Sequence, residues 1–218
     1  EKIMEISEIL GYIDHTKLSA TASWTEIEQL CKEALEYRTA SVCIPPCYVK
    51  RVREAFPKLN ICTVIGFPLG YMTTRAKAFE AADAANDGAD EIDMVINLCE
   101  VKNGNFDAVK NDIAAVRAAV PDKLLKVIIE TCYLTEDEKI RLCEIVTETG
   151  ADYIKTSTGF GTAGAQKSDI TLFKAHIGEN VKIKAAGGIR TKEDMEDYIA
   201  LGCSRIGTSG AGKLCGKE

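Results

Sequence analysis

Two lysines, Lys155 and Lys184, lie near the ends of two consecutive apolar runs, in the segments YIKTSTGF (153–160) and VKIKAAGGIR (181–190). An ionised lysine among apolar residues costs free energy unless it is paired, and two close ammonium groups disfavour each other's charge. One of the two amines can therefore be neutral near neutral pH. A neutral amine is a nucleophile that forms a Schiff base with a carbonyl compound, so this pair predicts covalent chemistry on an aldehyde or a ketone.

Asp93, in the run EIDMVIN, is the candidate carboxylate for the proton transfers of such a reaction. Schiff-base chemistry protonates a carbinolamine, expels water and removes a proton from carbon, and a buried carboxylate can do this directly or through water. Asp93 could instead only balance the charge of one lysine. Asp14 could hold a substrate hydroxyl, interact with Lys184 or form a structural corner, and Cys43 could face the substrate or simply fill space.

Three glycine-containing segments follow the last three apolar runs: STG at 157–159, GG at 187–188 and GTSG at 207–210. Such loops leave backbone N–H groups open to an anion at the start of a helical turn. Ordinary turns also use glycine, which is the simpler explanation of any one segment. Three on consecutive runs favour a site for a phosphate group.

These candidate residues depend on a framework of short β-rich runs that alternate with segments of helical period. Strand–helix alternation is typical of a parallel sheet with βαβ crossovers, and eight units can close into a (β/α)8 barrel, the TIM barrel of the α/β class. Phosphate sites of such barrels follow the last two strands. The eight runs lie at 12–16, 40–44, 61–67, 91–97, 124–131, 152–157, 181–186 and 204–209.

Local signals predict where several helices lie. Thr135 and Thr191 begin capping boxes, and glycines at 150 and 202 stand where helices end. Apolar stripes of helical period cover positions 27, 30, 31, 34 and 35, and positions 106, 109, 113, 116 and 120. The first ten residues predict a short amphipathic N-terminal helix. Its apolar side consists of Ile3, Ile6, Ile9 and Leu10.

An open, doubly wound sheet is the competing architecture. It usually has a glycine-rich dinucleotide loop after its first strand, where this chain has DHTKLSA instead. A barrel also brings the late-strand polar residues together at its C-terminal mouth, where active sites of this fold lie. These residues are Asp14, Cys43, Asp93, Lys155 and Lys184.

Length and composition limit the possible partners. The 218 residues, with 46% hydrophobic content, predict one domain over 1–218. A net charge of -6 without a dense basic cluster argues against nucleic acid as a partner. We therefore expect a small-molecule substrate.

The number and spacing of the cysteines and histidines bear on the redox compartment of the protein and on whether it binds a metal ion. Nine cysteines form an odd number, without a preceding secretory segment, and this favours reduced thiols in the cytoplasm. Without a CxxC pair, and with His15 and His176 far apart, we expect no metal site and no cofactor. The N-terminal segment is too short and too charged for a signal peptide or a membrane span, so we expect no membrane partner.

The motifs resemble those of the deoxyribose-phosphate aldolase family, class I aldolases that cleave 2-deoxy-D-ribose 5-phosphate to D-glyceraldehyde 3-phosphate and acetaldehyde. The resemblance implies that Lys155 forms the Schiff base, that Lys184 perturbs Lys155 and that Asp93 relays protons. It also implies a homo-oligomer, either a dimer or a tetramer. The matching segments run from DHT to GTS, through VCIPP, TVIGFPLG, GADEIDMVIN, KVIIET, YIKTSTGF and KAAGGIRT.

The same resemblance implies the substrate contacts. Two positions depart from the family pattern, because Ala186 and Gly210 stand where serine is common. Little chain follows the last run for an eighth helix, and a tail tyrosine of some members has no counterpart here. The implied substrate-binding residues are Asp14, Thr16, Cys43, Thr158, Gly159, Gly187, Gly188, Gly207 and Ser209.

Three alternatives remain at this point. Another class I aldolase or a transaldolase would keep the barrel and its lysine but act on a larger ketose. A metal-dependent aldolase would need ligands that the sequence does not present at metal spacing. A non-catalytic phosphosugar sensor could retain the glycine loops without turnover.

Overall fold

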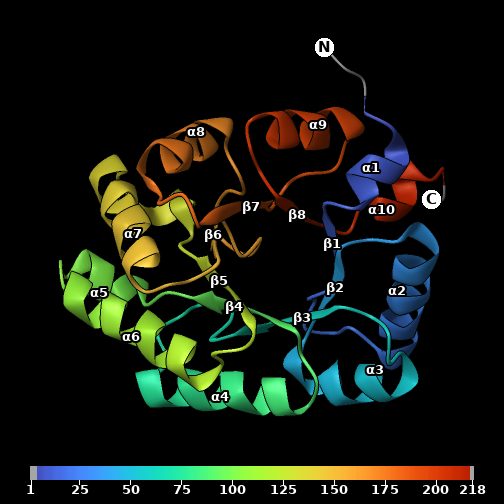
Figure 1. Cartoon of the computed structure of the whole chain (residues 1–218), viewed down its shortest axis with the longest axis horizontal. Coiled ribbons are helices and arrows are strands. Elements are labelled where there is room, and N and C mark those ends of the chain that lie inside the picture. Colours follow the sequence, from blue (N-terminus) through green and yellow to red (C-terminus); the bar gives the residue numbers. More distant parts are fainter. Residues whose placement is uncertain (1–3, 217–218) are drawn as a thin grey trace.

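The computed structural model describes residues 4–216, and its strands form one closed parallel barrel (Figure 1). Each strand pairs with the next in the chain, and β8 pairs back with β1. This confirms the expected (β/α)8 barrel. The strands are β1 (Ile13–Thr16), β2 (Ser41–Ile44), β3 (Ile61–Ile65), β4 (Glu91–Val95), β5 (Leu124–Ile128), β6 (Tyr153–Lys155), β7 (Lys182–Ala186) and β8 (Arg205–Thr208).

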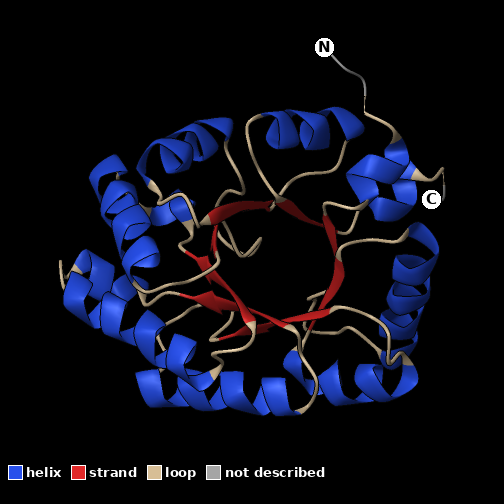
Figure 2. Ribbon diagram, in the orientation of Figure 1, coloured by secondary structure: helices blue, strands red, loops and turns tan. Residues whose placement is uncertain are grey.

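The helices form an outer layer around the ring of strands (Figure 2). A short N-terminal helix precedes the barrel, as expected, and short 3-10 helices follow β2 and β5. The α-helices are α1 (Ile6–Leu10), α2 (Trp24–Tyr37), α3 (Val49–Ala55), α4 (Thr74–Asn86), α5 (Leu98–Lys102), α6 (Phe106–Ala119), α7 (Glu136–Glu148), α8 (Lys167–His176), α9 (Lys192–Ala200) and α10 (Ala211–Leu214). The 3-10 helices are η1 (Pro46–Tyr48) and η2 (Thr131–Tyr133).

All eight expected runs contain a strand, but several strands end earlier than their runs. The clearest case is β6, which ends at Lys155 although its run extends to residue 157. The hydroxyl of Thr156 donates to the carbonyl of Ala186 at 3.2 Å and accepts the N–H of the same residue at 3.1 Å. Beyond Lys155 the chain thus stays attached to β7 through the side chain of Thr156, and Lys155 is the last residue of its own strand, next to the loop.

Two details of the predicted helices were wrong. Ile9 and Leu10 are buried, but Ile6 is 40% exposed because α1 begins only at that residue. Leu35 is 49% exposed although the other positions of its stripe are buried, because it lies about 100° around the helix from Ala34. The fourth residue of the expected N-terminal stripe, Ile3, lies outside the described residues.

The predicted helix boundaries are confirmed. Thr135 and Thr191 accept the N–H groups of the residues three positions later and form complete capping boxes at the starts of α7 and α9. Gly150 and Gly202, just beyond the ends of these helices, have φ of 71° and 110°. Positive φ suits glycine, so these two helices end where the sequence indicated.

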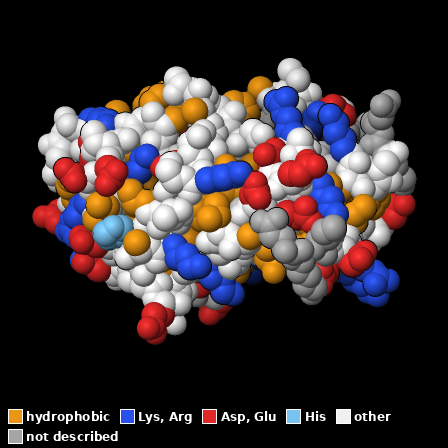
Figure 3. Space-filling view, turned by 90° about the horizontal axis from the view of Figure 1, so that it is seen from above, with side chains coloured by type: hydrophobic (Ala, Val, Ile, Leu, Met, Phe, Trp, Pro, Cys, Tyr) orange, Lys and Arg blue, Asp and Glu red, His pale blue; other side chains and the backbone are white. Residues whose placement is uncertain are grey.

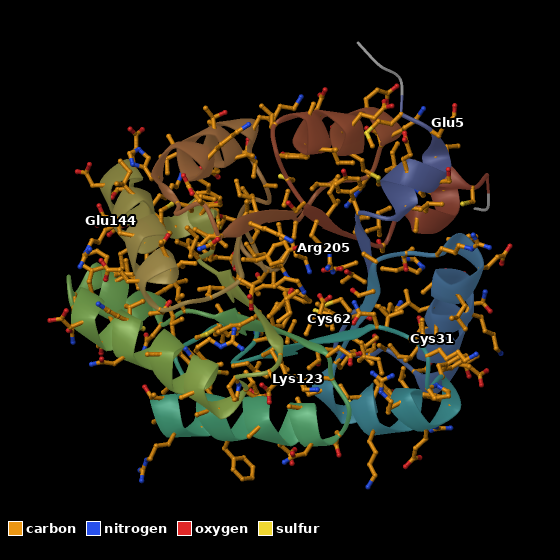
Figure 4. The ribbon with its side chains drawn as sticks, viewed as in Figure 1. Glu5, Cys31, Cys62, Lys123, Glu144 and Arg205 are labelled. Carbon is orange, nitrogen blue, oxygen red and sulfur yellow. The ribbon has the colours of Figure 1, made fainter. Side chains whose placement is uncertain are left out.

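The apolar core lies between the strands and the helices, whereas the centre of the barrel is polar. Successive side chains of a strand alternate between the two faces, so Ile92 packs in the outer core while Glu91 and Asp93 face the centre. Figure 4 places Cys62 and Arg205 toward this centre. Branched apolar side chains fill the interior of most barrels of this type, so the polar filling here requires compensating contacts.

A buried ion pair outside the barrel ties two helices to β4. Lys77 of α4 and Asp112 of α6 lie 2.7 Å apart and are almost fully buried. The Lys77 ammonium also donates to the carbonyl of Val95, the last residue of β4, at 2.8 Å. Burial lowers the pKa of Lys77 although Asp112 opposes the change. The pair therefore anchors the strand that carries Asp93.

The surface carries both signs of charge. On the face shown in Figure 3, basic and acidic side chains lie beside one another, with apolar side chains between them. Within residues 4–216, every helix is too short or too polar to cross a bilayer.

Replacing Asp112 by alanine should lower the free energy of unfolding by about 3–5 kcal/mol, because it leaves the Lys77 ammonium buried without its counter-ion. Urea denaturation measures this loss. The exposed pair of Lys110 and Glu148, at 2.8 Å, is the matched control, and Lys110→Ala should cost less than about 1 kcal/mol. Equal losses in the two variants would show that the buried pair contributes no more than a surface pair.

Candidate active site

The side chains at the barrel centre form an ionic network around Asp93. One carboxylate oxygen, Oδ2, accepts hydrogen bonds from Lys155 and Lys184, each at 2.8 Å. The other, Oδ1, accepts from Lys126 at 2.9 Å. Lys155 and Lys184 are paired neighbours on β6 and β7, and Lys126 is the neighbour of Asp93 on β5. One carboxylate therefore serves three lysines from three consecutive strands.

Asp14, Glu91 and Arg205 extend this network across the barrel. Asp14 accepts from Lys184 and from Arg205, each at 2.5 Å. Glu91 accepts from Lys126 at 2.5 Å and from Arg205 at 2.9 Å. Together with the residues around Asp93, the network contains four basic groups and three carboxylates.

These contacts set the charge states of the buried groups. Burial would raise the pKa of Asp93, but the three surrounding ammonium groups outweigh burial and hold the pKa well below its ordinary value. The pKa of Asp14 is lowered in the same way. Burial would lower the pKa of Lys184, but Asp14 and Asp93 outweigh it and raise the pKa; the pKa of Lys126 is raised for the same kind of reason. These carboxylates and these two lysines are therefore ionised at neutral pH.

A cavity of about 220 Å³ opens at the C-terminal ends of β1, β6, β7 and β8. Of the three lysines bound to Asp93, Lys155 alone lines this cavity. Lys155 is 3% exposed, whereas Lys126 and Lys184 are completely buried. The cavity is lined by Thr16, Leu18, Lys155, Thr158, Gly159, Phe160, Ala186, Gly187, Gly188, Ile189, Arg190, Gly207, Thr208 and Ser209.

The glycine loops bring the backbones of two loops into contact. Gly187 and Gly188 have φ of +88° and +79°, which side-chain-bearing residues rarely adopt. A Cβ atom on Gly164, in the loop after β6, would lie 2.1 Å from the carbonyl oxygen of Gly187. Only glycine at position 164 therefore allows this approach.

Glu130 fixes the loop after β6 from the end of β5. Its φ of +54° is unusual for a residue with a side chain, and its carboxylate is buried. Oε1 accepts the N–H of Thr158 at 3.0 Å, and Oε2 accepts the hydroxyl of the same residue at 2.5 Å. The Thr158 hydroxyl in turn accepts the N–H of Phe160 at 3.0 Å. Thr158 and Phe160 line the cavity, so Glu130 positions one of its walls.

The predicted site residues fall into three places. Asp14, Asp93 and Lys184 lie in the ionic network, next to the cavity lining but not part of it. Cys43 is completely buried beside Cys62 and also does not line the cavity. The remaining predicted residues line the cavity: Thr16, Lys155, Thr158, Gly159, Gly187, Gly188, Gly207 and Ser209.

Two buried groups have donor atoms close enough together to hold a metal ion. One consists of Cys43, Cys62 and Asp93, and the other of Asp14, Cys62 and Glu91. The three carboxylates of these groups accept hydrogen bonds from lysine or arginine. An ion in either group would therefore compete with basic side chains.

A family model decides the relationship of this chain to known proteins. The model of the DeoC/LacD family aldolases matches residues 9–218. The chain belongs to the DeoC/LacD aldolase family. It is 58% identical over 217 residues to a deoxyribose-phosphate aldolase of Clostridium botulinum, covering 99% of this chain and 98% of the relative. It is 55% identical over 214 residues to one of Clostridioides difficile, covering 98% of each chain.

Solved structures agree with this membership of the DeoC/LacD family. A putative deoxyribose-phosphate aldolase from Coccidioides immitis superposes with a TM-score of 0.94 at 40% identity, over 98% of this chain and 86% of that one. A deoxyribose phosphate aldolase from Aeropyrum pernix, described as a unique tetrameric structure, superposes with a TM-score of 0.89 at 29% identity, over 96% and 90% of the two chains.

Sequence reasoning missed five residues around this aldolase site. Lys126 carried the same signal as the two predicted lysines, a charge inside an apolar run, and Glu91 lies two residues before Asp93 on the same strand face. Arg205 and Arg190 lie within or beside quoted motifs, but neither of them was assigned a role from the sequence. Glu130 gave no signal, because its positive φ and its contact with the next loop are visible only in three dimensions.

Replacing Glu130 by alanine should lower the free energy of unfolding by about 1–3 kcal/mol, because the Thr158 N–H loses its buried acceptor. Hydrogen exchange of the amides at 157–160 should accelerate, as followed by mass spectrometry. Glu144→Ala, at an exposed position on α7, is the control and should leave this loop unchanged. Unchanged exchange at 157–160 in Glu130→Ala would show that the carboxylate does not hold the loop.

Proposed function

We propose that this protein is a deoxyribose-phosphate aldolase, a lyase that reversibly cleaves 2-deoxy-D-ribose 5-phosphate to D-glyceraldehyde 3-phosphate and acetaldehyde through a Schiff base on Lys155. The observation that carries the proposal is the difference among the three buried lysines. All three donate to Asp93, but Lys155 alone lines the cavity. Relatives of 55% and 58% identity over almost the full length, both named deoxyribose-phosphate aldolase, support the choice of substrate.

The charge balance of the network also distinguishes Lys155 from the other basic groups. Lys126, Lys184 and Arg205 are enough to balance the three carboxylates of the network. A fourth positive charge would lie in a buried site without its own counter-ion, which is costly. Attack on a carbonyl carbon uses the unprotonated amine of the lysine that reaches the cavity.

The cleavage then follows from the chemistry of an imine. The Lys155 amine attacks C1 of the open-chain sugar, and loss of water from the carbinolamine gives a protonated imine. The imine accepts the electron pair of the C2–C3 bond as that bond breaks, the C3 hydroxyl loses its proton, and D-glyceraldehyde 3-phosphate leaves. The remaining enamine takes a proton on carbon, and water releases acetaldehyde and restores the amine.

Asp93 and Lys184 form the proton relay in this proposal. The Asp93 carboxylate lies 2.8 Å from the Lys155 nitrogen, within reach for proton transfer to and from the carbinolamine. Lys184 lies between Asp14 and Asp93, and its ammonium keeps Asp93 ionised. Asp14 acts through Lys184 and not through the substrate.

The remaining cavity residues bind the substrate in this proposal. The hydroxyls of Thr16 and Thr158 lie at the cavity wall, where each already donates within the protein, to the Asp14 carbonyl and to Glu130, so each can serve the sugar only as an acceptor. The phosphate group lies at the glycine loops after β6, β7 and β8, with Arg190 as the cation of the cavity lining. The loop residues are Gly159, Gly187, Gly188, Gly207 and Ser209.

We also infer that the chain, as one domain over 1–218, acts in the cytoplasm as a homo-oligomer, a dimer or a tetramer. Nine free cysteines support a reducing compartment. The tetrameric relative supports self-association, as do large apolar side chains on the surface. The most exposed are Leu69, Tyr71, Phe79 and Phe160, at 53%, 58%, 74% and 55%.

Borohydride reduction in the presence of acetaldehyde should attach a two-carbon unit to Lys155, because only a Schiff base is reduced to a stable amine. Peptide mapping locates the label. Lys155→Met should take no label and should lose cleavage of 2-deoxyribose 5-phosphate by at least about a thousandfold, as expected for the loss of a nucleophile.

Three outcomes would contradict parts of this assignment. Label confined to Lys126 or Lys184 would move the nucleophile to another lysine. A wild-type protein that labels at Lys155 but releases no acetaldehyde from 2-deoxyribose 5-phosphate would be an aldolase for another substrate. Equal KM values for 2-deoxyribose and its 5-phosphate would remove the phosphate from the proposal.

Lys184→Met should move the rising limb of the pH–rate profile to higher pH. Without Lys184, three basic groups face three carboxylates, so a positive charge beside Asp93 is better compensated than in the wild type. Activity should fall steeply near neutral pH and recover partly as the pH rises, whereas Lys155→Met should not recover. A Lys184→Met profile with the wild-type midpoint would reject charge balance as the role of Lys184.

A further inference from the structure

Cys43 and Cys62 form a buried pair of thiols beside Asp93. They are paired neighbours on β2 and β3, are free, and have no exposed surface. The two sulfur atoms and one carboxylate oxygen of Asp93 lie within 4.8 Å of one another. Two donors that bind one ion at about 2.3 Å lie at most about 4.6 Å apart. Small movements of the side chains are therefore enough for the three donors to share an ion.

We propose that Cys43, Cys62 and Asp93 form a site for a soft divalent cation of the Zn²⁺ and Cd²⁺ type, and that an ion bound there inhibits the aldolase. Thiolate sulfur is the donor that such cations prefer, and a carboxylate oxygen is an acceptable third ligand. The proposed cleavage uses no metal, so the ion is an inhibitor and not a cofactor.

The charge balance of the barrel centre permits this ion. Binding replaces the two thiol protons by one divalent cation and releases two protons, so the total charge of the buried groups does not change. The Lys126 ammonium, 3.2 Å from the Cys62 sulfur, can donate to the thiolate that forms. Such contacts to a ligand atom stabilise metal sites.

Asp93 couples the ion to the reaction. The Cys62 thiol donates to Asp93 Oδ1 at 3.2 Å, and Oδ2 of the same carboxylate accepts from Lys155 and Lys184. An ion on Asp93 withdraws electron density from the carboxylate and competes with both lysines. The proton relay then fails, and this consequence rests on the proposed function.

The other thiols are separable from this pair. Cys31, Cys143 and Cys203 are buried, and among the described residues none of them belongs to a group of three possible metal ligands. Cys47 and Cys99 are exposed, and Cys132 and Cys215 are partly exposed. Replacing these four cysteines by serine gives a parent protein whose reaction with thiophilic ions reports on the buried pair.

The test titrates Cd²⁺ into this parent protein and records cadmium–thiolate ultraviolet absorption together with aldolase activity. We expect absorption to saturate at one ion per chain, activity to fall at least tenfold over the same range, and a chelator to reverse both. Cys62→Ser keeps a hydroxyl beside Asp93 but removes one sulfur ligand. It should lose the absorption step and keep its own metal-free activity in Cd²⁺, whereas Cys203→Ser should behave like the parent.

The outcomes separate the site from its effect. Absorption that is absent in the parent, or unchanged in Cys62→Ser, overturns the site; if Cys62→Ser does not fold, Cys43→Ser gives the same absorption test. A complete absorption step with unchanged activity overturns the inhibition. Because the absorption does not require turnover, a metal-free protein that fails to cleave the sugar phosphate refutes the proposed function and leaves the metal titration to be judged by itself.

Discussion

A charge at the centre of this barrel has almost no water to stabilise it, so each charge depends on an opposite charge within hydrogen-bond distance. Asp93 accepts hydrogen bonds from more of the basic groups than any other residue of the network, since three lysines donate to its two oxygens. Its partners come from strands β5, β6 and β7, and Asp14 and Glu91 continue the contacts to β1 and β8 through Arg205. The charges can be balanced only if these strands keep their register, so the network specifies the barrel as well as its chemistry.

Such a network is a poor source of stability, because the removal of charges from water offsets much of their attraction. The surrounding structure supplies what the network does not. Apolar residues between strands and helices form the main core, and the Lys77–Asp112 pair fixes the end of β4 from outside. The unusual backbone of Glu130 is a further cost that its two contacts with Thr158 offset. The apolar outer layer therefore stabilises a polar centre that could not fold alone.

The fold could be predicted from the sequence because each of its elements has a local cause. Alternating apolar runs specify strands, and capping boxes at Thr135 and Thr191 specify helix starts, whatever the rest of the chain does. Lys155, Lys184 and Asp93 could be singled out because charges are conspicuous inside apolar runs. Their mutual distances follow from barrel closure, which brings Asp93 within reach of residues 62 and 91 positions away.

Other features could not be predicted, because they depend on the partner across a strand or loop. Cys43 and Cys62 are separated in the sequence by η1, α3 and a loop, and only the pairing of β2 with β3 makes them neighbours. Lys126 could be placed in a strand from the sequence, but its position at the barrel centre could not be predicted, since nothing local indicates which strand face points inward. Leu35 shows the same limit on a helix, because a position at the edge of an apolar stripe is buried or exposed according to what packs beside it.

The contact between Gly164 and Gly187 has a consequence for how this enzyme family can vary. The N–H of Ala165 donates to the carbonyls of Ala186 and Gly187 at 3.0 and 3.1 Å, so the loop after β6 and the loop after β7 are joined main chain to main chain. An insertion in either loop would separate both from the cavity that they line. Changes in length at this side of the mouth must therefore occur in the two loops together.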